Sequence, residues 1–216
     1  VGPQAVQDKV GADPTGLPFN SVIALELHGG KPLSPLVNAG AIATTSLINA
    51  ENTEQRWQRI LHIQQQLAGE QVALSDEVNQ SEQTTNFHNR AIAWLLYSAG
   101  YLYCDAMEAC DVYTRQCSTL INTIELATLG ATLAAGGVNP LTHKRVLQAD
   151  NVPYILAEMM MEGLYGRSGD WAYRVGLPGK SGVGGGILAV VPGVMGIAAF
   201  SPPLDEEGNS VRDQKM

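Results

Sequence analysis

The sequence has few charges, no long hydrophobic run and no cluster of positive charge. Only 16% of its 216 residues are charged and 45% are hydrophobic, which excludes a disordered chain. No apolar run reaches the ~18 residues of a membrane span, and the chain does not open with a signal-peptide pattern. The net charge of −8, with no run of Lys or Arg, excludes a nucleic-acid surface. We therefore expect a soluble cytoplasmic domain over 1–216, with neither nucleic acid nor membrane as a partner.

Cysteine is also scarce. The three cysteines, Cys104, Cys110 and Cys117, lie in one segment, and an odd number so placed does not fit a disulfide framework. We expect semi-buried thiols in a reducing cytoplasm. None of the four histidines lies at metal-ligand spacing from another ligand. The sequence therefore indicates neither a metal nor an organic cofactor.

Helical periodicity dominates residues 40–165, and we expect this part to form a mainly helical subdomain. Asn52 and Gln55 resemble a capping box that starts one helix, and Gly69 ends that helix. Apolar runs and end signals of this kind predict several helices. Their expected ranges are 41–47, 52–69, 87–97, 105–115 and 154–161.

Two other segments carry weaker signals. Residues 22–27 are too few for periodicity to separate a helix from a strand. A further helix is expected to be capped by Ser118 or Thr119 and to end at Gly136-Gly137. The side chains that this helix should turn inward are Ile121, Ile124, Leu126 and Leu129.

The period changes within residues 175–210. Two apolar runs, 187–191 and 195–200, flank Pro192-Gly193 and predict a β-hairpin. One hairpin is only marginally stable by itself and needs more strands and helices packed on it. We therefore expect an incomplete antiparallel sheet in this chain, with its first strands encoded upstream of Val1.

The most distinctive motif is Lys180-Ser181-Gly182 with the glycines that follow it. A phosphate loop requires glycine at position 174, where this chain has Arg174, and also a helix after the motif. A dinucleotide fingerprint fails because a strand follows the glycines. The K-[ST]-G strand of penicillin-recognising serine enzymes and β-lactamases fits better, since a lysine charge and a following backbone N–H border the reacting carbonyl. A simple glycine-rich turn into the hairpin remains the alternative.

Longer blocks around this motif resemble bacterial serine-dependent glutaminases, in consistent order through essentially the whole chain. Three blocks carry the resemblance, namely 32–40 (PLSPLVNAG), 86–93 (NFHNRAIA) and 180–210. The family implies an α/β fold like that of β-lactamases and penicillin-binding proteins, with a helical subdomain and an antiparallel sheet. It also implies hydrolysis of the side-chain amide of L-glutamine through an acyl-enzyme, and a homo-oligomer, either a dimer or a tetramer.

The resemblance also implies the site residues. The catalytic positions are Tyr113, Lys180 and Ser181. The substrate-binding positions are Asn38, Glu82, Asn89, Tyr113, Tyr165 and Val183. Glu82 is expected to pair with the substrate α-ammonium, and Val183 to act through its backbone N–H in an oxyanion hole. Lys180 is expected to lower the pKa of nearby hydroxyls by its charge.

Each of these positions also has a purely structural interpretation. Tyr113 has Cys110 and Cys117 at helical spacing, which is equally typical of a core residue. Tyr165 precedes a glycine and fits a loop anchor, and Glu82 fits a solvated surface charge. Asn38 lies between apolar neighbours, so its burial would require polar partners.

The chain departs from the family in one respect. The nucleophile and base of these enzymes come from an S-x-x-K motif, and no serine here is followed three residues later by lysine. We expect that segment upstream of Val1 and a terminal helix beyond Met216, and hence no turnover by 1–216 alone. The alternatives are a non-catalytic chain that binds glutamine or glutamate, and a penicillin-recognising serine enzyme.

Overall fold

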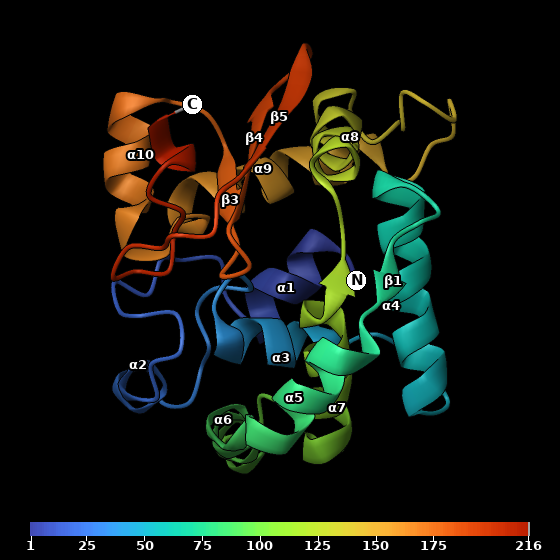
Figure 1. Ribbon diagram of the computed structural model, residues 1–216. Helices are drawn as coiled ribbons and strands as arrows, with labels where there is room; N and C mark the ends of the chain where they lie inside the picture. The colour runs from blue at the N-terminus through green and yellow to red at the C-terminus, as the bar shows by residue number, and fades with distance from the viewer. Residues whose placement is uncertain (216) are drawn as a thin grey trace. The chain divides into compact units, whose positions relative to one another are not determined.

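The computed structural model describes residues 1–215, which form two compact units. Unit 1 comprises Val1–His62 and Ala73–Leu120. Unit 2 comprises Ile63–Val72 and the described residues from Ile121 onward. Figure 1 shows the helices and strands of both units. No helix within 1–215 is long and apolar enough to cross a bilayer.

Unit 1 is mainly helical. Its helices are α1 (Pro3–Lys9), α2 (Ile23–Leu27), α3 (Asn38–Ser46), the first part of α4 (Thr53–Ala68), α5 (Asp76–Thr85), α6 (Phe87–Ser98) and α7 (Ala106–Cys117). Two short antiparallel strands, β1 (Ala73–Leu74) and β2 (Thr119–Leu120), pair Ala73 with Leu120.

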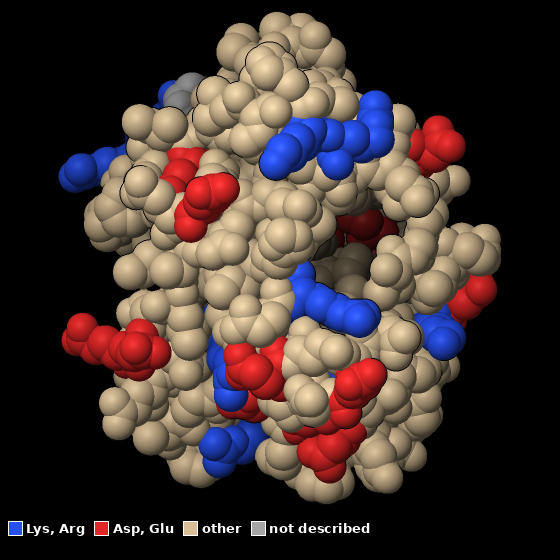
Figure 2. Space-filling view, turned by 90° about the vertical axis from the view of Figure 1, so that its right-hand side faces the viewer, with Lys and Arg blue, Asp and Glu red and all other residues tan. Residues whose placement is uncertain are grey.

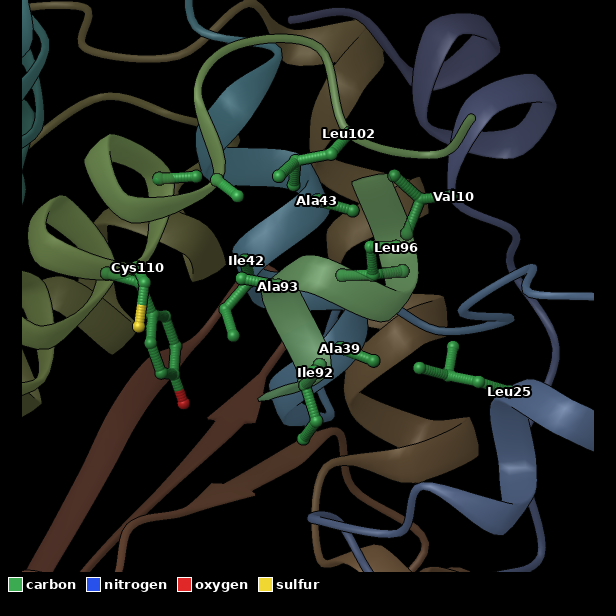
Figure 3. Packing of buried hydrophobic residues seen from close by; sticks show 13 residues of the cluster. Val10, Leu25, Ala39, Ile42, Ala43, Ile92, Ala93, Leu96, Leu102 and Cys110 are labelled. Carbon is green, nitrogen blue, oxygen red and sulfur yellow. The ribbon is translucent and has the colours of Figure 1, made fainter. Parts of the chain in front are cut away.

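The core of unit 1 forms where α3, α6 and α7 pack together. Ile42, Ile92 and Leu96 are fully buried in one apolar cluster, which also includes Cys110. Figure 3 shows side chains of all three helices in this cluster. Burial of each large aliphatic side chain contributes about 1.5–3 kcal/mol to folding, so this cluster fixes the three helices against one another.

Unit 2 combines helices with a sheet. Its elements are the end of α4, α8 (Thr123–Ala134), η1 (Ala149–Asn151), α9 (Val152–Glu162), η2 (Tyr165–Arg167), α10 (Ser168–Arg174), β3 (Gly179–Ser181), β4 (Gly186–Val191), β5 (Met195–Phe200) and η3 (Asp213–Lys215). The sheet is antiparallel with strand order β3-β4-β5. Its register pairs Lys180 with Leu188 and Leu188 with Ala198.

Helix α8 lies directly on the sheet of unit 2. A Cβ atom on Gly196 would come within 2.4 Å of the backbone nitrogen of Ala131, and one on Gly130 within 3.0 Å of the Cα atom of Gly196. Glycine at both positions therefore lets the helix and strand backbones touch. Leu133 of α8 and Leu188 of β4 are buried in the apolar cluster that results.

Most of the predicted elements are confirmed. The hairpin forms as β4 and β5, and the five predicted helical ranges correspond to α3, α4, α6, α7 and α9. Residues 22–27 resolve as helix α2. Helices α1, α5 and α10 and strands β1 and β2 were not predicted.

The prediction for α8 was wrong in two respects. Its cap is neither Ser118 nor Thr119 but Asn122, which forms a capping box with Glu125. Ile124 does not face the core, because its side chain is 74% exposed. Ile121 is exposed as well, whereas Leu126 and Leu129 pack against the core as expected. The error in the cap placed the start of the apolar face too early.

The expectation of semi-buried thiols is met by Cys104, which is half-buried, and by Cys110, which is buried, whereas Cys117 is exposed. Figure 2 shows a face on which Lys and Arg side chains are scattered among acidic ones. No disulfide joins the three cysteines within the described chain. Burial raises the pKa of the Cys104 and Cys110 thiols, so both stay protonated at neutral pH. No group of three or more His, Cys, Asp or Glu within 1–215 is arranged to hold a metal ion.

Candidate functional site

Three of the predicted site residues meet in unit 1. The Asn38 side chain lies at the start of α3 and donates from Nδ2 to Oδ1 of Asn89 on α6, at 2.9 Å. The hydroxyl of Tyr113 on α7 donates to Oδ1 of Asn38 at 3.1 Å. We call these three residues the Asn38 network. Because Asn38 uses both ends of its amide, the orientation of each side chain depends on the other two.

The Asn38 network rests on the buried core of unit 1. Tyr113 is 9% exposed and belongs to the apolar cluster, so it is a core residue whose hydroxyl also bonds to Asn38. Next to it in sequence, Thr114 accepts a hydrogen bond at 2.9 Å from Nδ2 of Asn86, which is buried at the start of α6. This contact fixes the end of α6 that carries Asn89 against the part of α7 that carries Tyr113.

Glu82 is not joined to the Asn38 network. It is exposed on α5, and its carboxylate has no hydrogen bond or ion pair with any described residue. The neighbouring Gln83 instead connects α5 to α7, with its Nε2 atom 2.7 Å from a carboxylate oxygen of Asp111. Glu82 thus presents an unneutralised negative charge on an anchored helix.

The other predicted side chains with polar groups meet in unit 2. The ammonium of Lys180 on β3 donates to the hydroxyl of Tyr165 and to the carbonyl of Gly163, each at 3.2 Å. It also lies 4.3 Å from the centre of the Tyr165 ring and bonds to the carbonyl of Ser181. Its position is therefore set by several oxygen atoms and by an aromatic face.

The C-terminal end of α9 lies against the outer edge of strand β3, the edge that does not pair with β4. Ser181 points its N–H away from β4, and this group donates to the carbonyl of Gly163 at 3.0 Å. A Cβ atom on Gly163 would lie 1.7 Å from the carbonyl oxygen of Gly179. Only glycine allows this approach, which satisfies an otherwise unpaired strand edge. The Ser181 hydroxyl donates to Oδ1 of the buried Asn209.

We call this second group of residues the β3 edge network. Its members come from three separate stretches of unit 2. They are Gly163, Leu164, Tyr165, Lys180, Ser181 and Asn209.

A tight turn follows β3 and carries Val183. Gly182 donates to the carbonyl of Gly186, and Gly185 donates to that of Gly182, each at 2.9 Å. Val183 is 58% exposed, and no described residue accepts a hydrogen bond from its N–H. A hydrogen-bonded turn therefore presents an unused backbone donor, which is the kind of group that stabilises an oxyanion.

The comparison with known proteins decides the family. A family model described as Glutaminase matches residues 1–216. The chain belongs to the glutaminase family. It is 99% identical over 216 residues to the glutaminase of Escherichia coli O81 (strain ED1a), covering 100% of this chain and 70% of that relative. The chain thus spans about 70% of the length of this curated relative.

Solved glutaminases share its fold. A Bacillus subtilis probable glutaminase is 35% identical, with a TM-score of 0.95 over 99% of this chain and 72% of that one. Another solved structure, of a Bacillus subtilis glutaminase in covalent complex with 5-oxo-L-norleucine, is 32% identical with a TM-score of 0.85, over 96% of this chain and 68% of that one. The predicted α/β, β-lactamase-like fold is confirmed.

Several residues of this glutaminase chain support the candidate site and were not predicted. Asn86, Gly163 and Asn209 all bond to segments far away in the sequence. Asn209 stands in a Gly-Asn-Ser sequence whose turn character was evident, but its side-chain partners were not. Gly163 carried one usable signal, since a glycine that ends an apolar helix marks a place of close backbone approach.

Proposed function

We propose that this chain provides the substrate-binding and oxyanion-stabilising part of an enzyme that hydrolyses L-glutamine to L-glutamate and ammonia. The observation that carries the proposal is the glutaminase match over all 216 residues. The Bacillus subtilis relative supports the substrate class, because its covalent complex formed by reaction with 6-diazo-5-oxo-L-norleucine, an analogue of glutamine. The family match also favours this function over a penicillin-recognising enzyme.

The reaction consists of two acyl transfers. A serine hydroxyl attacks the side-chain amide carbon of glutamine and gives up its proton, and the amide C–N bond breaks as ammonia leaves with that proton. Water then attacks the resulting ester, and the serine is released with glutamate. Each attack places negative charge on the former carbonyl oxygen, so fixed N–H donors accelerate both steps.

Unit 1 is proposed to hold the polar groups of the glutamine backbone. Glu82 offers an exposed carboxylate for the α-ammonium. Asn38 and Asn89 offer amide groups whose orientation the Asn38 network fixes. The Tyr113 hydroxyl, held by Asn38, would handle a proton of the reacting groups. These are the roles that the family resemblance assigned to the four positions.

Unit 2 is proposed to act on the reacting carbonyl. The N–H of Val183 would donate to its oxygen, and the positive charge of Lys180 would stabilise the same developing charge. Tyr165 contacts that ammonium and would form one wall for the substrate. The hydroxyl of Ser181 on β3 is proposed to relay hydrogen bonds to the reacting groups.

We further propose that the 216-residue chain does not turn over glutamine, since it contains no S-x-x-K sequence. The test is ammonia release from L-glutamine by this chain and by the Escherichia coli O81 relative. We expect no turnover from the chain. In the relative, Lys180→Ala at the matching position should lower kcat about 100-fold or more. Unchanged kcat would remove Lys180 from the mechanism, and a robust rate from the chain would place a nucleophile within it.

We also propose a homo-oligomer, dimer or tetramer, located in the cytoplasm. Large apolar side chains exposed on α6 support the assembly, since Phe87 is 68% and Trp94 51% exposed. Sedimentation equilibrium of the purified chain tests the assembly, and a monomer at all concentrations would refute it.

A further inference from the structure

Asn209 connects the two segments of unit 2 that carry Lys180 and Tyr165. Its side chain is fully buried. Its Oδ1 atom accepts from the hydroxyl of Ser181, which is adjacent to Lys180, and its Nδ2 atom donates to the carbonyl of Leu164 at 3.1 Å. Leu164 in turn is adjacent to Tyr165. One amide thus bonds to both neighbours of the Lys180–Tyr165 pair.

Asn209 is itself held firmly in place. Its backbone N–H donates to a carboxylate oxygen of Asp205 at 2.9 Å, and its carbonyl accepts from the N–H of Asp205 at 2.8 Å. The N–H of Glu207 donates to the same carboxylate at 3.0 Å. A closed turn over 205–209 therefore fixes the amide before it meets its partners.

The backbone of Tyr165 needs such an anchor. Its φ of 54° lies in the left-handed region, which costs a residue with a side chain roughly 1–2 kcal/mol. Leu164 is held on both sides, because its N–H donates to the Ser168 hydroxyl at 3.0 Å and its carbonyl accepts from the Asn209 side chain at 3.1 Å and from the N–H of Arg167 at 3.0 Å. Without these contacts the backbone would relax, and the Tyr165 ring would move away from Lys180.

We propose that Asn209 is a positioning residue that holds Tyr165 against the Lys180 ammonium, acting through the carbonyl of Leu164 and the hydroxyl of Ser181. The inference rests on the proposed function of Lys180 and Tyr165. It assigns Asn209 no contact with glutamine.

The main test is Asn209→Asp in the Escherichia coli O81 glutaminase at the matching position. Aspartate has nearly the same shape and keeps an acceptor for Ser181, but it removes the side-chain donor to the Leu164 carbonyl and leaves that carbonyl with the N–H of Arg167. We expect kcat/KM for glutamine to fall about 10- to 100-fold, because a displacement of about 1 Å has effects of this size. Ser168→Ala removes the hydroxyl that accepts from the Leu164 N–H and should lower kcat/KM in the same direction by a smaller factor.

The matched control is Asn139→Asp. Asn139 is equally buried in unit 2, and its Nδ2 atom donates to the carbonyl of Gln66 at 2.9 Å, with no hydrogen bond to the β3 edge network. This variant should lower the melting temperature by a similar amount with kcat/KM changed less than about 2-fold. Equal losses of kcat/KM in the Asn139 and Asn209 variants would overturn the proposal.

A double-mutant cycle with Tyr165→Phe separates the two levels of the argument. If Asn209 acts through Tyr165, Asn209→Asp should change kcat/KM much less when combined with Tyr165→Phe than it does in the wild type. If the effects of Asn209→Asp and Tyr165→Phe on kcat/KM simply multiply, Asn209 does not act through Tyr165. This outcome would contradict the positioning role but not the proposed function of the Lys180–Tyr165 pair. If Tyr165→Phe and Lys180→Ala both leave the activity intact, the proposed function of the pair is wrong, and the inference falls with it.

Discussion

The Asn38 network and the β3 edge network are built from different kinds of hydrogen bond. In the Asn38 network, side chains from three helices bond to one another, with distances of 2.9 and 3.1 Å. In the β3 edge network, Lys180 and Ser181 bond largely to backbone carbonyls, among them that of Gly163. The first network depends on where helices pack, and the second on how closely two backbone segments approach.

This difference predicts how each network fails. Loss of the Asn38 or Asn89 side chain, or of the Tyr113 hydroxyl, removes one or two hydrogen bonds and leaves the helices in place, because Ile42, Ile92 and Leu96 still hold them in the apolar cluster. A side chain added at the edge of β3 forces two backbone segments apart, and relieving such a clash costs much free energy because neither backbone can move alone. Substitutions in the two units should therefore differ in size as well as in effect.

The largest effect is expected from Gly163→Ala. The new Cβ atom would lie 1.7 Å from the Gly179 carbonyl oxygen and 2.4 Å from that of Met159, so β3 must separate from the end of α9. We expect a loss of about 3 kcal/mol or more in the free energy of unfolding. Chemical denaturation of the 216-residue chain measures this loss.

Gly169→Ala provides the control. Gly169 lies in α10, and a Cβ atom there would have no heavy atom within 4 Å. Alanine should leave stability unchanged or raise it by up to about 1 kcal/mol. If both alanine variants behave alike, close backbone approach is not what holds the edge of β3.

The second effect concerns the support of the Asn38 network. Asn86→Ala removes the contact to Thr114 at 2.9 Å that joins α6 to α7. Because both groups are buried, we expect a loss of about 1–3 kcal/mol in stability. In the Escherichia coli O81 relative, KM for glutamine should rise, since Asn89 shifts with the start of α6.

A cycle with Thr114→Val isolates this contact. The two substitutions should be less than additive, with a coupling energy of about 1 kcal/mol. Strict additivity would mean that the two helices are aligned by their apolar cluster alone.

The sequence was sufficient to predict elements whose determinants are local. The two apolar runs over 187–191 and 195–200, with Pro192-Gly193 between them, predicted the hairpin, and Asp105 caps α7 from directly before it. The cap of α8 failed because Ser118, Thr119 and Asn122 are all competent caps. Asn122 is the cap because Thr119 and Leu120 pair as a strand with β1, which comes from a distant part of the chain.

The sequence predicted only those site residues that lie within recognisable motifs or at positions that resemble the family. Resemblance to a family supplied the positions, and the structure brings Asn38, Asn89 and Tyr113 into contact as one group and Lys180, Tyr165 and Ser181 as another. The supports escaped prediction because their partners lie far away in sequence. A buried asparagine such as Asn209 looks like any turn residue until its partners are known.

A smaller effect should distinguish Tyr113→Phe from Tyr103→Phe. Each variant loses one hydroxyl in unit 1, because Tyr113 donates to Asn38 at 3.1 Å and Tyr103 donates to the Lys9 carbonyl at 2.9 Å. Each should cost about 1 kcal/mol of stability. Only Tyr113→Phe should lower kcat, by about 10-fold or more, as measured by ammonia release in the Escherichia coli O81 relative. Equal activity in the two variants would leave Tyr113 with a core role only.

The smallest effect is a dependence of stability on pH at the β3 edge network, which comes from Asp205 through its hydrogen bond to Asn209. Burial raises the pKa of Asp205, but hydrogen bonds from Asn209, Gln214 and Glu207 and the charge of Arg167 outweigh it, so the pKa lies below its ordinary value. A lowered pKa stabilises the fold above the pKa of the unfolded chain, about 4, and this contribution is lost as the pH falls through the folded value.

Asp205→Asn should therefore lower the melting temperature at pH 7, and the difference from the wild type should shrink as the pH falls below about 4. The control is Glu206→Gln, which removes the same charge from an exposed side chain that has no hydrogen bond to any described residue. If this control reproduces the pH dependence, net charge is responsible. If only Asp205→Asn shows it, the carboxylate that closes the turn over 205–209 makes the position of Asn209 sensitive to acid. The Asn38 network contains only neutral side chains, so its hydrogen bonds should persist over the same pH range.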